Sequence, residues 1–584
     1  MAVEQLITQH IDTWTSALRT RSTAGRGTSG KIDLYGIKKL RELILELAVR
    51  GKLVPQDPND EPASELLKRI AAEKAELVKQ GKIKKQKPLP EISEDEKPFE
   101  LPVGWEWVRL NDIMADIHYG YTASADETKK IKLLRITDIQ DDKVNWATVP
   151  GCDISEKMAE QYKLKDNDIV IARTGGTVGK SYLVENINVP SVFASYLIRL
   201  KYLPPMQAQF TKIFLGSQLY WKQLYDGTSG TGQPNVNGNT LKAIILPVAP
   251  IDEQNNIISK VKELMSLCDQ LEQQSLTSLD AHYQLVETLL STLTDSQNAE
   301  ELAENWARIS QYFDTLFTTE ASIDALKQTI LQLAVMGKLV PQDPSDEQAS
   351  ELLERIEQEK AQLVKEGKIK KQKPLPPISE DEKPFELPVG WEWCRISDLA
   401  MFTTSGSRDW AKYLSTEGAL FITMGNLSRG SYALRMDNLR FVEPPEGGEG
   451  SRTKLEAFDL VISITGDVGN LGLIPDDFGE AYINQHSCLL RFMPICRNYY
   501  FAEFMRSPLA KAQFNAPQRG IKNSFRLSDI GEMLVSLPPL EEQNFIAIKI
   551  NELMMICDRL KSRLQSSQQT QLHLADALTE AALN

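Results

Sequence analysis

Apolar residues recur three and four positions apart in several stretches of the chain, which is the spacing of one helix face. The first clear set follows Asp33 and comprises Leu40, Leu43, Ile44, Leu47 and Ala48. Gly51 marks its end, so this set predicts a helix of about four turns. A second helix is predicted from about Pro62 to Lys79, with Gly81 at its C-terminal end.

Two later stretches, 249–271 and 538–560, place apolar residues in alternating three- and four-residue steps. The corresponding positions are Ile257, Val261, Leu264, Cys268 and Leu271 in the first, and Ile546, Ile550, Leu553, Cys557 and Leu560 in the second. This heptad pattern is typical of long helices that pack against other helices. Continued through Leu293, the first helix would span ~40 residues, or ~60 Å.

Two segments between the helical stretches carry short β-type runs, for example Asp168–Ala172 and Asp459–Ser463. They are called here the first variable block (108–246) and the second variable block (400–536). Each is long enough to form an independent α/β domain. The blocks correspond weakly, in two short alignments: 172–180 with 463–470, and 196–200 with 488–492.

The remainder of the chain is a tandem repeat. Residues 40–113 match 326–399 at 57 of 74 positions with a constant offset of 286, and both copies contain LPVGWEW. Each copy gives a helical pair, a GWEW segment, a variable block and a long helix. We call the repeated helical pair, GWEW segment and long helix of each copy a frame. Two similar frames that hold two different variable blocks fit a protein that reads two different features of its ligand. If that ligand is duplex DNA, the reading heads lie about one helical turn apart, ~34–36 Å, or a multiple of it.

Charge and composition narrow the class of protein. The 584 residues carry a net charge of -14, which argues against a non-specific polyanion binder. Both variable blocks are nearly neutral, so the acidity lies mainly outside them. The six cysteines form no CxxC pair and the five histidines have no metal-ligand spacing, so we expect reduced structural thiols. The N-terminus lacks a signal-peptide pattern and no apolar run reaches the length of a membrane span. These features predict a cytoplasmic protein.

Two connecting segments receive no functional prediction. Residues 1–30 combine a short helical pattern with a Ser-, Thr- and Gly-rich run that is typical of a flexible tether. Lys82–Pro90 is a basic connector, for which a solvated role is favoured over contact with phosphate or a partner subunit.

The repeated motifs resemble those of a known family. Its marks are KLREL, LAVRGKLVPQDP, GKIKKQK and LPVGWEW within 39–107, the segments 249–254 and 538–543, and the pairs Cys268-Asp269 and Cys557-Asp558. Over essentially its full length the chain resembles the specificity subunit of type I restriction-modification systems, in the subgroup with a long N-terminal helical region. Ala249 stands where the second copy has Pro538, a small departure.

The resemblance implies an α+β fold with two α/β target recognition domains separated by long antiparallel coiled-coil-like helices, tandem-duplicated in a pseudo-two-fold arrangement. Each domain would read one half of a bipartite asymmetric site in double-stranded DNA. The helices would set the spacing and dock two methyltransferase subunits, which restriction/translocase subunits join. The chain itself would be non-catalytic, with S-adenosylmethionine, ATP and Mg²⁺ on partner subunits.

The expected divisions of the chain follow the repeat. They are a helical region and linker (1–99), recognition domain 1 (100–248), a central helical region (249–385), recognition domain 2 (386–537) and a C-terminal helix (538–584).

The first candidate site is the glycine-rich segment 173–181. It nearly matches GxxxxGK[ST], but Thr174 replaces a required glycine and the flanks predict strand, turn and strand, so we interpret it as a glycine hairpin. The family resemblance places such a turn near DNA. The candidate contacts are Arg173, Thr174, Gly175 and Lys180, with Thr465 and Gly466 at the matching turn.

The second candidate site is the loop at the end of each variable block. The amide-rich loop 227–239 offers Gln233, Asn235 and Asn237, and amides of this type can bind adenine. The matching loop is charged and offers Arg519, Lys522, Asn523, Ser524 and Arg526, of which the two arginines are suited to guanine or phosphate. An ordinary surface loop is the alternative in both cases.

Other features favour structure over chemistry. The four GWEW tryptophans are identical in both copies although the blocks differ, which favours core packing over base stacking. No methyltransferase, nucleotide-binding or nuclease motif is evident, so we expect no catalysis by this chain. The open alternatives are a protein-binding scaffold with two heads and an enzyme with an unrecognised site.

Overall fold

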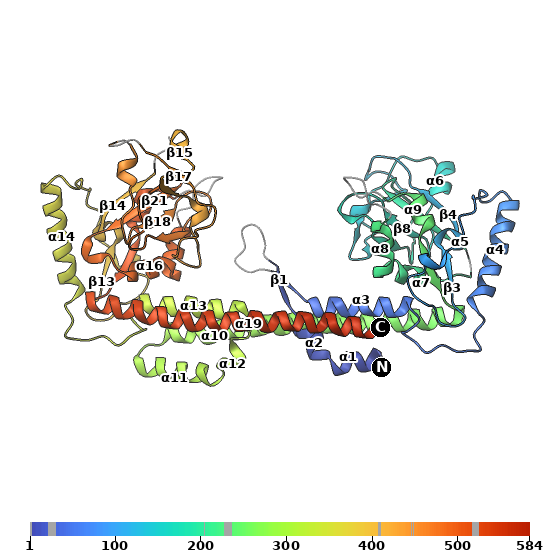
Figure 1. The fold of residues 1–584 in the computed structure, drawn as a ribbon, viewed down its shortest axis with the longest axis horizontal. Coiled ribbons are helices and arrows are strands. Elements are labelled where there is room, and N and C mark those ends of the chain that lie inside the picture. Colours follow the sequence, from blue (N-terminus) through green and yellow to red (C-terminus); the bar gives the residue numbers. More distant parts are fainter. Residues whose placement is uncertain are drawn as a thin grey trace. The chain divides into compact units, whose positions relative to one another are not determined.

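The computed structural model describes residues 3–21, 31–203, 205–226, 236–406, 410–444, 447, 449–516 and 525–583. The chain divides into two compact units (Figure 1). The first unit comprises residues 1–278 and 567–584, and the second comprises residues 279–566. Each unit contains one variable block, one pair of repeated helices, the first part of one long helix and the last part of the other.

The helices of the first unit agree with the helical periods of the sequence. The two repeated helices are α3 (Tyr35–Val49) and α4 (Ala63–Lys79), which confirms both predictions. They follow α1 (Val3–Gln9), α2 (Ile11–Ser16) and the antiparallel strands β1 (Arg19–Arg21) and β2 (Lys31–Asp33). In the second unit, residues 299–365 form α11 (Ala299–Gln311), α12 (Phe313–Leu316), α13 (Glu320–Val335) and α14 (Ala349–Lys365). α4 and α14 each lie beside the variable block of their own unit (Figure 1).

The two heptad stretches form single long helices, α10 (Ile251–Asp295) and α19 (Leu540–Leu583). All five predicted seam residues of α10 are buried. On α19, Ile546, Ile550 and Cys557 are buried, while Leu553 and Leu560 are half-buried. The heptad prediction is confirmed because these residues pack into the interior of their units.

The Cys-Asp pairs of the long helices have a packing role. Each cysteine is buried in the seam, and the following aspartate pairs with a cation on a repeated helix. Arg41 on α3 contacts Asp269 at 2.7 Å, and Lys327 on α13 contacts Asp558. Because Arg41 and Lys327 are equivalent in the repeat, both units join their helices in the same way.

Two equivalent lysines cap the C-terminal ends of the long helices. Lys52 Nζ donates to the carbonyl of Leu583 at 2.6 Å, and Lys338 Nζ donates to those of Thr294 and Ser296 at 2.6 and 2.9 Å. The last carbonyls of a helix lack partners within the helix and carry partial negative charge. A lysine in each repeated GKLVPQDP motif therefore stabilises the C-terminal end of a long helix.

The first variable block is built on a four-stranded antiparallel sheet with the strand order β4-β11-β8-β9. Its strands are β4 (Met114–Tyr119), β8 (Ile169–Ala172), β9 (Ser181–Leu183) and β11 (Leu197–Tyr202). Further strand pairs are β5 (Lys132–Leu134) with β10 (Ser191–Phe193), and β6 (Ile139–Gln140) with β7 (Lys143–Val144). The helices are α5 (Leu110–Ile113), α6 (Glu156–Tyr162), α7 (Ala208–Phe214), α8 (Gln218–Asp226) and α9 (Gly238–Ala243).

The second variable block repeats this sheet in the order β14-β21-β18-β19. Its strands are β14 (Ala400–Ser405), β18 (Leu460–Ser463), β19 (Leu471–Leu473) and β21 (Ser487–Phe492). A second four-stranded sheet contains β15 (Leu414–Ser415), β16 (Ala419–Ile422), β17 (Phe441–Val442) and β20 (Ala481–Ile483). The helices are α15 (Ile396–Leu399), α16 (Tyr499–Arg506), α17 (Pro508–Asn515) and α18 (Leu527–Glu532).

The strand register corrects one alignment made from the sequence. Leu200 pairs with Ile169 on β8, and Leu490 pairs with Leu460 at the matching position on β18. The structural equivalent of Arg199 is therefore Leu489, and not Arg491 as the alignment of 196–200 with 488–492 required. The error is two residues, and a two-residue slip keeps every side chain on the same face of a strand, so the apolar pattern could not reveal it.

The GWEW segments form the strands that open each block, and these pair with the strands that close it. β3 (Glu106–Arg109) pairs antiparallel with β12 (Ile245–Val248), and β13 (Glu392–Arg395) pairs in the same way with β22 (Leu534–Leu537). The chain therefore enters and leaves each variable block at adjacent strands. The fold confirms a mixed α and β architecture with two repeated domains and long helices.

Candidate nucleic-acid interface

The glycine-rich segment of the first variable block is a hairpin turn between β8 and β9. Gly175 and Gly179 have φ values of 80° and 83°, and the Gly179 N–H donates to the Ala172 carbonyl at 2.8 Å. A strand follows the turn, where a phosphate-binding loop would start a helix. The predicted hairpin is confirmed, and the nucleotide-binding interpretation remains excluded.

The candidate side chains on this turn differ in exposure. Lys180 and Gly175 are exposed, while Thr174 and Arg173 are half-buried. The Arg173 guanidinium lies over the ring of Tyr119, 4.6 Å from its centroid, within the range of a cation–π interaction. Tyr119 was not among the predicted site residues, because it lies at the end of β4, far from the turn in sequence.

The end of the amide-rich loop returns to this turn. The Val236 N–H donates to the Arg173 carbonyl at 2.9 Å, and the Gly238 N–H donates to the Tyr119 hydroxyl at 3.0 Å. Asn237 caps α9, its side-chain oxygen accepting from the N–H groups of Asn239 and Thr240. This structural role occupies the Asn237 oxygen. Gln233 and Asn235 lie outside the described residues.

The second variable block has the same arrangement. The Phe525 N–H donates to the Ile464 carbonyl at 2.9 Å, matching the bond between Val236 and Arg173. Arg526 follows, exposed at the start of α18, and the half-buried Thr465 and exposed Gly466 lie on the turn. Arg519, Lys522, Asn523 and Ser524 lie outside the described residues. In both blocks the structure therefore joins the two candidate segments, which the sequence placed about 60 residues apart.

The chemistry at the matching positions differs. Arg173 and Tyr119 of the first block correspond to Ile464 and Ser405 of the second, given the paired registers of the strands before them. In the second block Arg429 pairs with Asp467 of the turn at 2.7 Å. The same scaffold thus presents different side chains in the two blocks.

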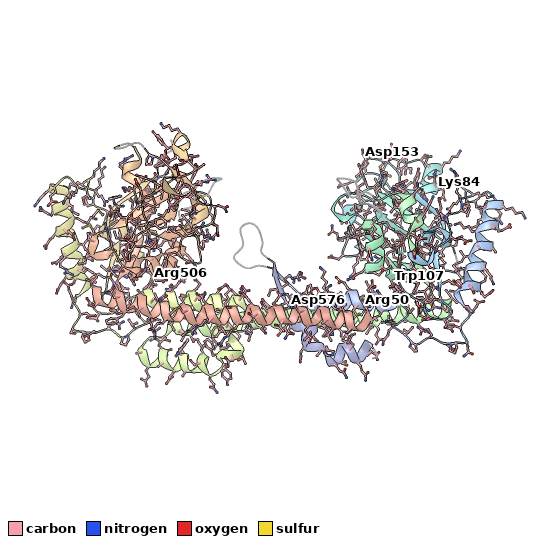
Figure 2. The ribbon with its side chains drawn as sticks, in the orientation of Figure 1. Arg50, Lys84, Trp107, Asp153, Arg506 and Asp576 are labelled. Carbon is pink, nitrogen blue, oxygen red and sulfur yellow. The ribbon has the colours of Figure 1, made fainter. Side chains whose placement is uncertain are left out.

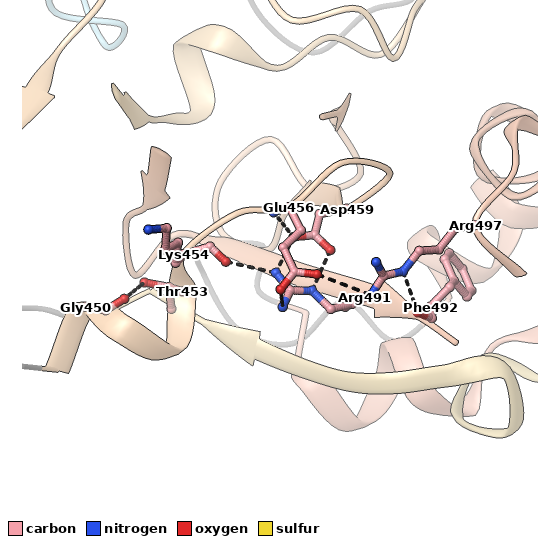
Figure 3. Close-up of polar contacts among 8 residues, drawn as sticks. All are labelled: Gly450, Thr453, Lys454, Glu456, Asp459, Arg491, Phe492 and Arg497. Atoms are coloured by element: carbon pink, nitrogen blue, oxygen red, sulfur yellow. Dashed lines mark hydrogen bonds and ion pairs between the residues drawn. The ribbon is translucent and has the colours of Figure 1, made fainter. Parts of the chain in front are cut away.

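A buried ion pair fixes the strands beneath each turn, a feature that the sequence analysis missed. Arg491 Nε and Nη2 contact the two carboxylate oxygens of Asp459 at 2.8 and 2.6 Å (Figure 3). Arg491 also contacts Glu456 at 2.6 Å. In the first block Arg199 contacts Asp168 at 3.4 Å. The sequence does contain a sign of this ion pair, because an aspartate begins both β-type runs.

Burial raises the pKa of the Asp459 carboxyl, and the hydrogen bond and charge of Arg491 oppose this shift. A buried carboxylate that is held by two guanidinium hydrogen bonds resists displacement. The pair therefore holds the strand that carries the turn.

The first tryptophan of each GWEW segment belongs to the frame. Trp105 Nε1 donates to Glu253 at 2.9 Å, and Trp391 Nε1 donates to Glu542 at 2.9 Å. Both indoles are buried, which confirms the packing interpretation for this pair. The second tryptophan, Trp107, is half-buried and packs on Phe99, over which the Arg50 guanidinium also lies; Figure 2 labels Trp107 and Arg50.

Comparison with known proteins assigns the chain to a family. A family model described as the type I restriction modification DNA specificity domain matches residues 102–281 and 388–567. Two curated relatives from Escherichia coli, the type I restriction enzyme EcoEI and EcoAI specificity subunits, are 49% and 48% identical over the full length of both chains. The chain belongs to the family of type I restriction-modification specificity subunits.

A solved HsdS subunit from Thermoanaerobacter tengcongensis is 15% identical to this specificity subunit, with a TM-score of 0.39 over 83% of the chain and 98% of the solved one. The sequence relatives carry the family assignment. Among the described residues of this specificity subunit, no group of His, Cys, Asp and Glu could hold a metal ion. No described helix is long and apolar enough to cross a membrane.

Proposed function

We propose that this specificity subunit reads a bipartite, asymmetric sequence in double-stranded DNA, with one half-site for each variable block. Sequence recognition requires side chains that contact base edges, and phosphate contacts position those side chains. The subunit is the non-catalytic, DNA-recognising component of a type I restriction-modification complex.

One observation carries the proposal. The two blocks share the hairpin turn, the returning loop and the backbone bond between them, yet differ in the side chains placed there. A common scaffold with unlike reading residues is what two half-sites of different sequence require. The candidate contacts remain those predicted: Arg173, Thr174, Gly175, Lys180, Gln233, Asn235, Asn237, Thr465, Gly466, Arg519, Lys522, Asn523, Ser524 and Arg526.

The partners follow from the family. The subunit assembles with other restriction-modification subunits, and we propose two methyltransferase subunits joined by restriction/translocase subunits. S-adenosylmethionine, ATP and Mg²⁺ belong to those subunits, and the complex works in the cytoplasm. We propose recognition domains at 100–248 and 386–537, with helical regions at 1–99, 249–385 and 538–584.

The decisive experiment is selection of duplex DNA from a random pool by the subunit bound to its methyltransferase partner. The expected result is one motif with two defined half-sites separated by a spacer of fixed length. Mapping the methylated adenines in DNA from cells that carry the complex should return the same motif. Binding should weaken steeply with salt, because phosphate contacts release counterions.

Two results would contradict the proposal. A complex that binds DNA without any sequence preference would remove the reading role. Indifference to duplex DNA together with tight binding of a protein ligand would favour a two-headed protein scaffold.

A further inference from the structure

We propose that Tyr119 positions Arg173 to read a guanine in the half-site of the first variable block. This inference rests on the proposed function and adds a positioning residue and a base to it. Tyr119 lies on β4 and Arg173 directly follows β8, two strands that flank β11 in the same sheet.

The backbone of Arg173 is held on both sides. Its N–H donates to the carbonyl of Tyr196 at 3.1 Å, and its carbonyl accepts from Val236 at 2.9 Å. The side chain therefore leaves the sheet from a fixed point. The preceding strand is buried along its whole length, so that point has little freedom to move.

The ring of Tyr119 restrains the position of the Arg173 guanidinium. The two groups lie 4.6 Å apart, and the Tyr119 hydroxyl accepts a hydrogen bond from the Gly238 N–H at 3.0 Å. This bond ties the ring to the first residue of α9. A guanidinium held over an aromatic ring by a cation–π contact donates no hydrogen bond to a carboxylate there, so its N–H groups stay available for another acceptor.

Arg173 differs from the other arginines of the block. The first variable block contains four arginines, and three of them are bound by carboxylates: Arg109 by Glu96, Arg135 by Asp138 and Arg199 by Asp168. Within the described part of the chain, Arg173 forms no ion pair, and its buried Nε has no hydrogen-bond partner. An aromatic ring in place of a carboxylate holds the side chain without using its hydrogen-bonding edge.

Guanine is the base that this geometry fits. Its O6 and N7 atoms present two adjacent acceptors in the major groove, which match the paired N–H groups of a guanidinium. A phosphate would also accept from Arg173, but it would not require a guanidinium held in one position by an aromatic ring. The second block has Ser405 and Ile464 at these positions, so the inference concerns one half-site only.

The test compares variants of the full subunit bound to its methyltransferase partner. The probes are the selected duplex and duplexes with single base substitutions in each half-site. Tyr119→Leu and Arg173→Lys are each expected to reduce the preference for guanine at one position of the first half-site by about tenfold, the scale of one bidentate contact. The double variant should lose no more than either single variant, because both changes remove one contact.

Tyr119→Phe keeps the aromatic ring and is expected to retain most of the guanine preference. Ser405→Ala is the matched control in the second block and should leave the first half-site unchanged. Thermal unfolding of each variant separates lost reading from lost folding. If Tyr119→Leu fails to fold, the inference is tested by the two single variants Arg173→Lys and Tyr119→Phe.

A loss of affinity in Arg173→Lys that is the same for all duplexes would assign Arg173 to a phosphate and overturn the inference. An unchanged base preference in Arg173→Lys would also overturn it. A wild-type complex without any preferred motif would instead contradict the proposed function itself.

Discussion

The buried ion pair between Arg491 and Asp459 joins β21 to the residue that precedes β18 in the second variable block. Both side chains are nearly inaccessible to water, and Glu456 and the Lys454 carbonyl complete the environment of the guanidinium (Figure 3). Removing one member of a buried pair leaves the other charge without compensation, which costs more than the intact pair contributes.

We therefore expect Arg491→Leu to lower the free energy of unfolding of the second variable block by about 3–5 kcal/mol. Hydrogen exchange of the full chain, measured against urea, would locate the loss in β18 and β21. Replacing the exposed Arg440 by leucine is the matched control and should change stability by less than about 0.5 kcal/mol. Equal protection in Arg491→Leu and wild type would show that the pair does not hold these strands.

Burial changes the acidity of the cysteine thiols. Burial raises the pKa of Cys268 to about 11 and that of Cys496 to about 12. A thiol is reactive only as thiolate, so native protein at pH 8 should resist iodoacetamide, while urea-unfolded protein should react at all cysteines. Mass spectrometry of the labelled peptides would measure this difference.

The same shift sets a pH dependence. Above the ordinary thiol pKa the unfolded chain releases its thiol protons before the folded chain does. Stability should therefore fall as the pH rises from about 9 to 11. Fast native labelling of Cys268 at pH 8 would contradict both the burial and the shift.

At the scale of elements, the hairpin turn requires glycine at position 179 but not at position 176, three residues earlier. Gly179 has a φ of 83°, and a Cβ there would lie 2.3 Å from Leu224 Cδ2 and 2.7 Å from the Trp221 ring. Gly176 has open space around its missing Cβ.

We expect Gly179→Ala to destabilise the first variable block by about 1–3 kcal/mol through strain in the turn, and Gly176→Ala to have little effect. Hydrogen exchange of β8 and β9, measured against urea, would compare the two variants. Equal stability of the two variants would mean that the turn can rearrange.

The sequence predicted the elements unequally well. Helical periods located α3, α4 and the two long helices, because each buries one continuous apolar face. The matching strand alignment was wrong by two residues, since a slip of two preserves the alternation of faces. The two candidate segments could be chosen from their residues, but the Tyr119 platform arises only when β4 and β8 join one sheet.

At the scale of the whole molecule, the two frames make the same contacts around unlike blocks. Arg109 donates to the carbonyl of Ala243, and Arg395 donates in the same way to the carbonyl of Glu532, both at 3.0 Å. The bond from tryptophan to glutamate recurs as well. A block therefore meets the same strand ends in either frame.

This equivalence predicts that the blocks are exchangeable. Replacing residues 110–244 by residues 396–533 joins matching strand ends and keeps every frame contact named above. Such a chain should fold and, with its methyltransferase partner, select a motif in which the second half-site occurs twice. Selection from a random duplex pool would read the outcome directly. If the exchanged chain still prefers the original first half-site, the frame and not the block determines that half-site. If it selects two new half-sites, the sequence read by each block depends on the other block. Because the frame contacts are the same in both repeats while the turn residues differ, we expect only the exchanged half-site to change.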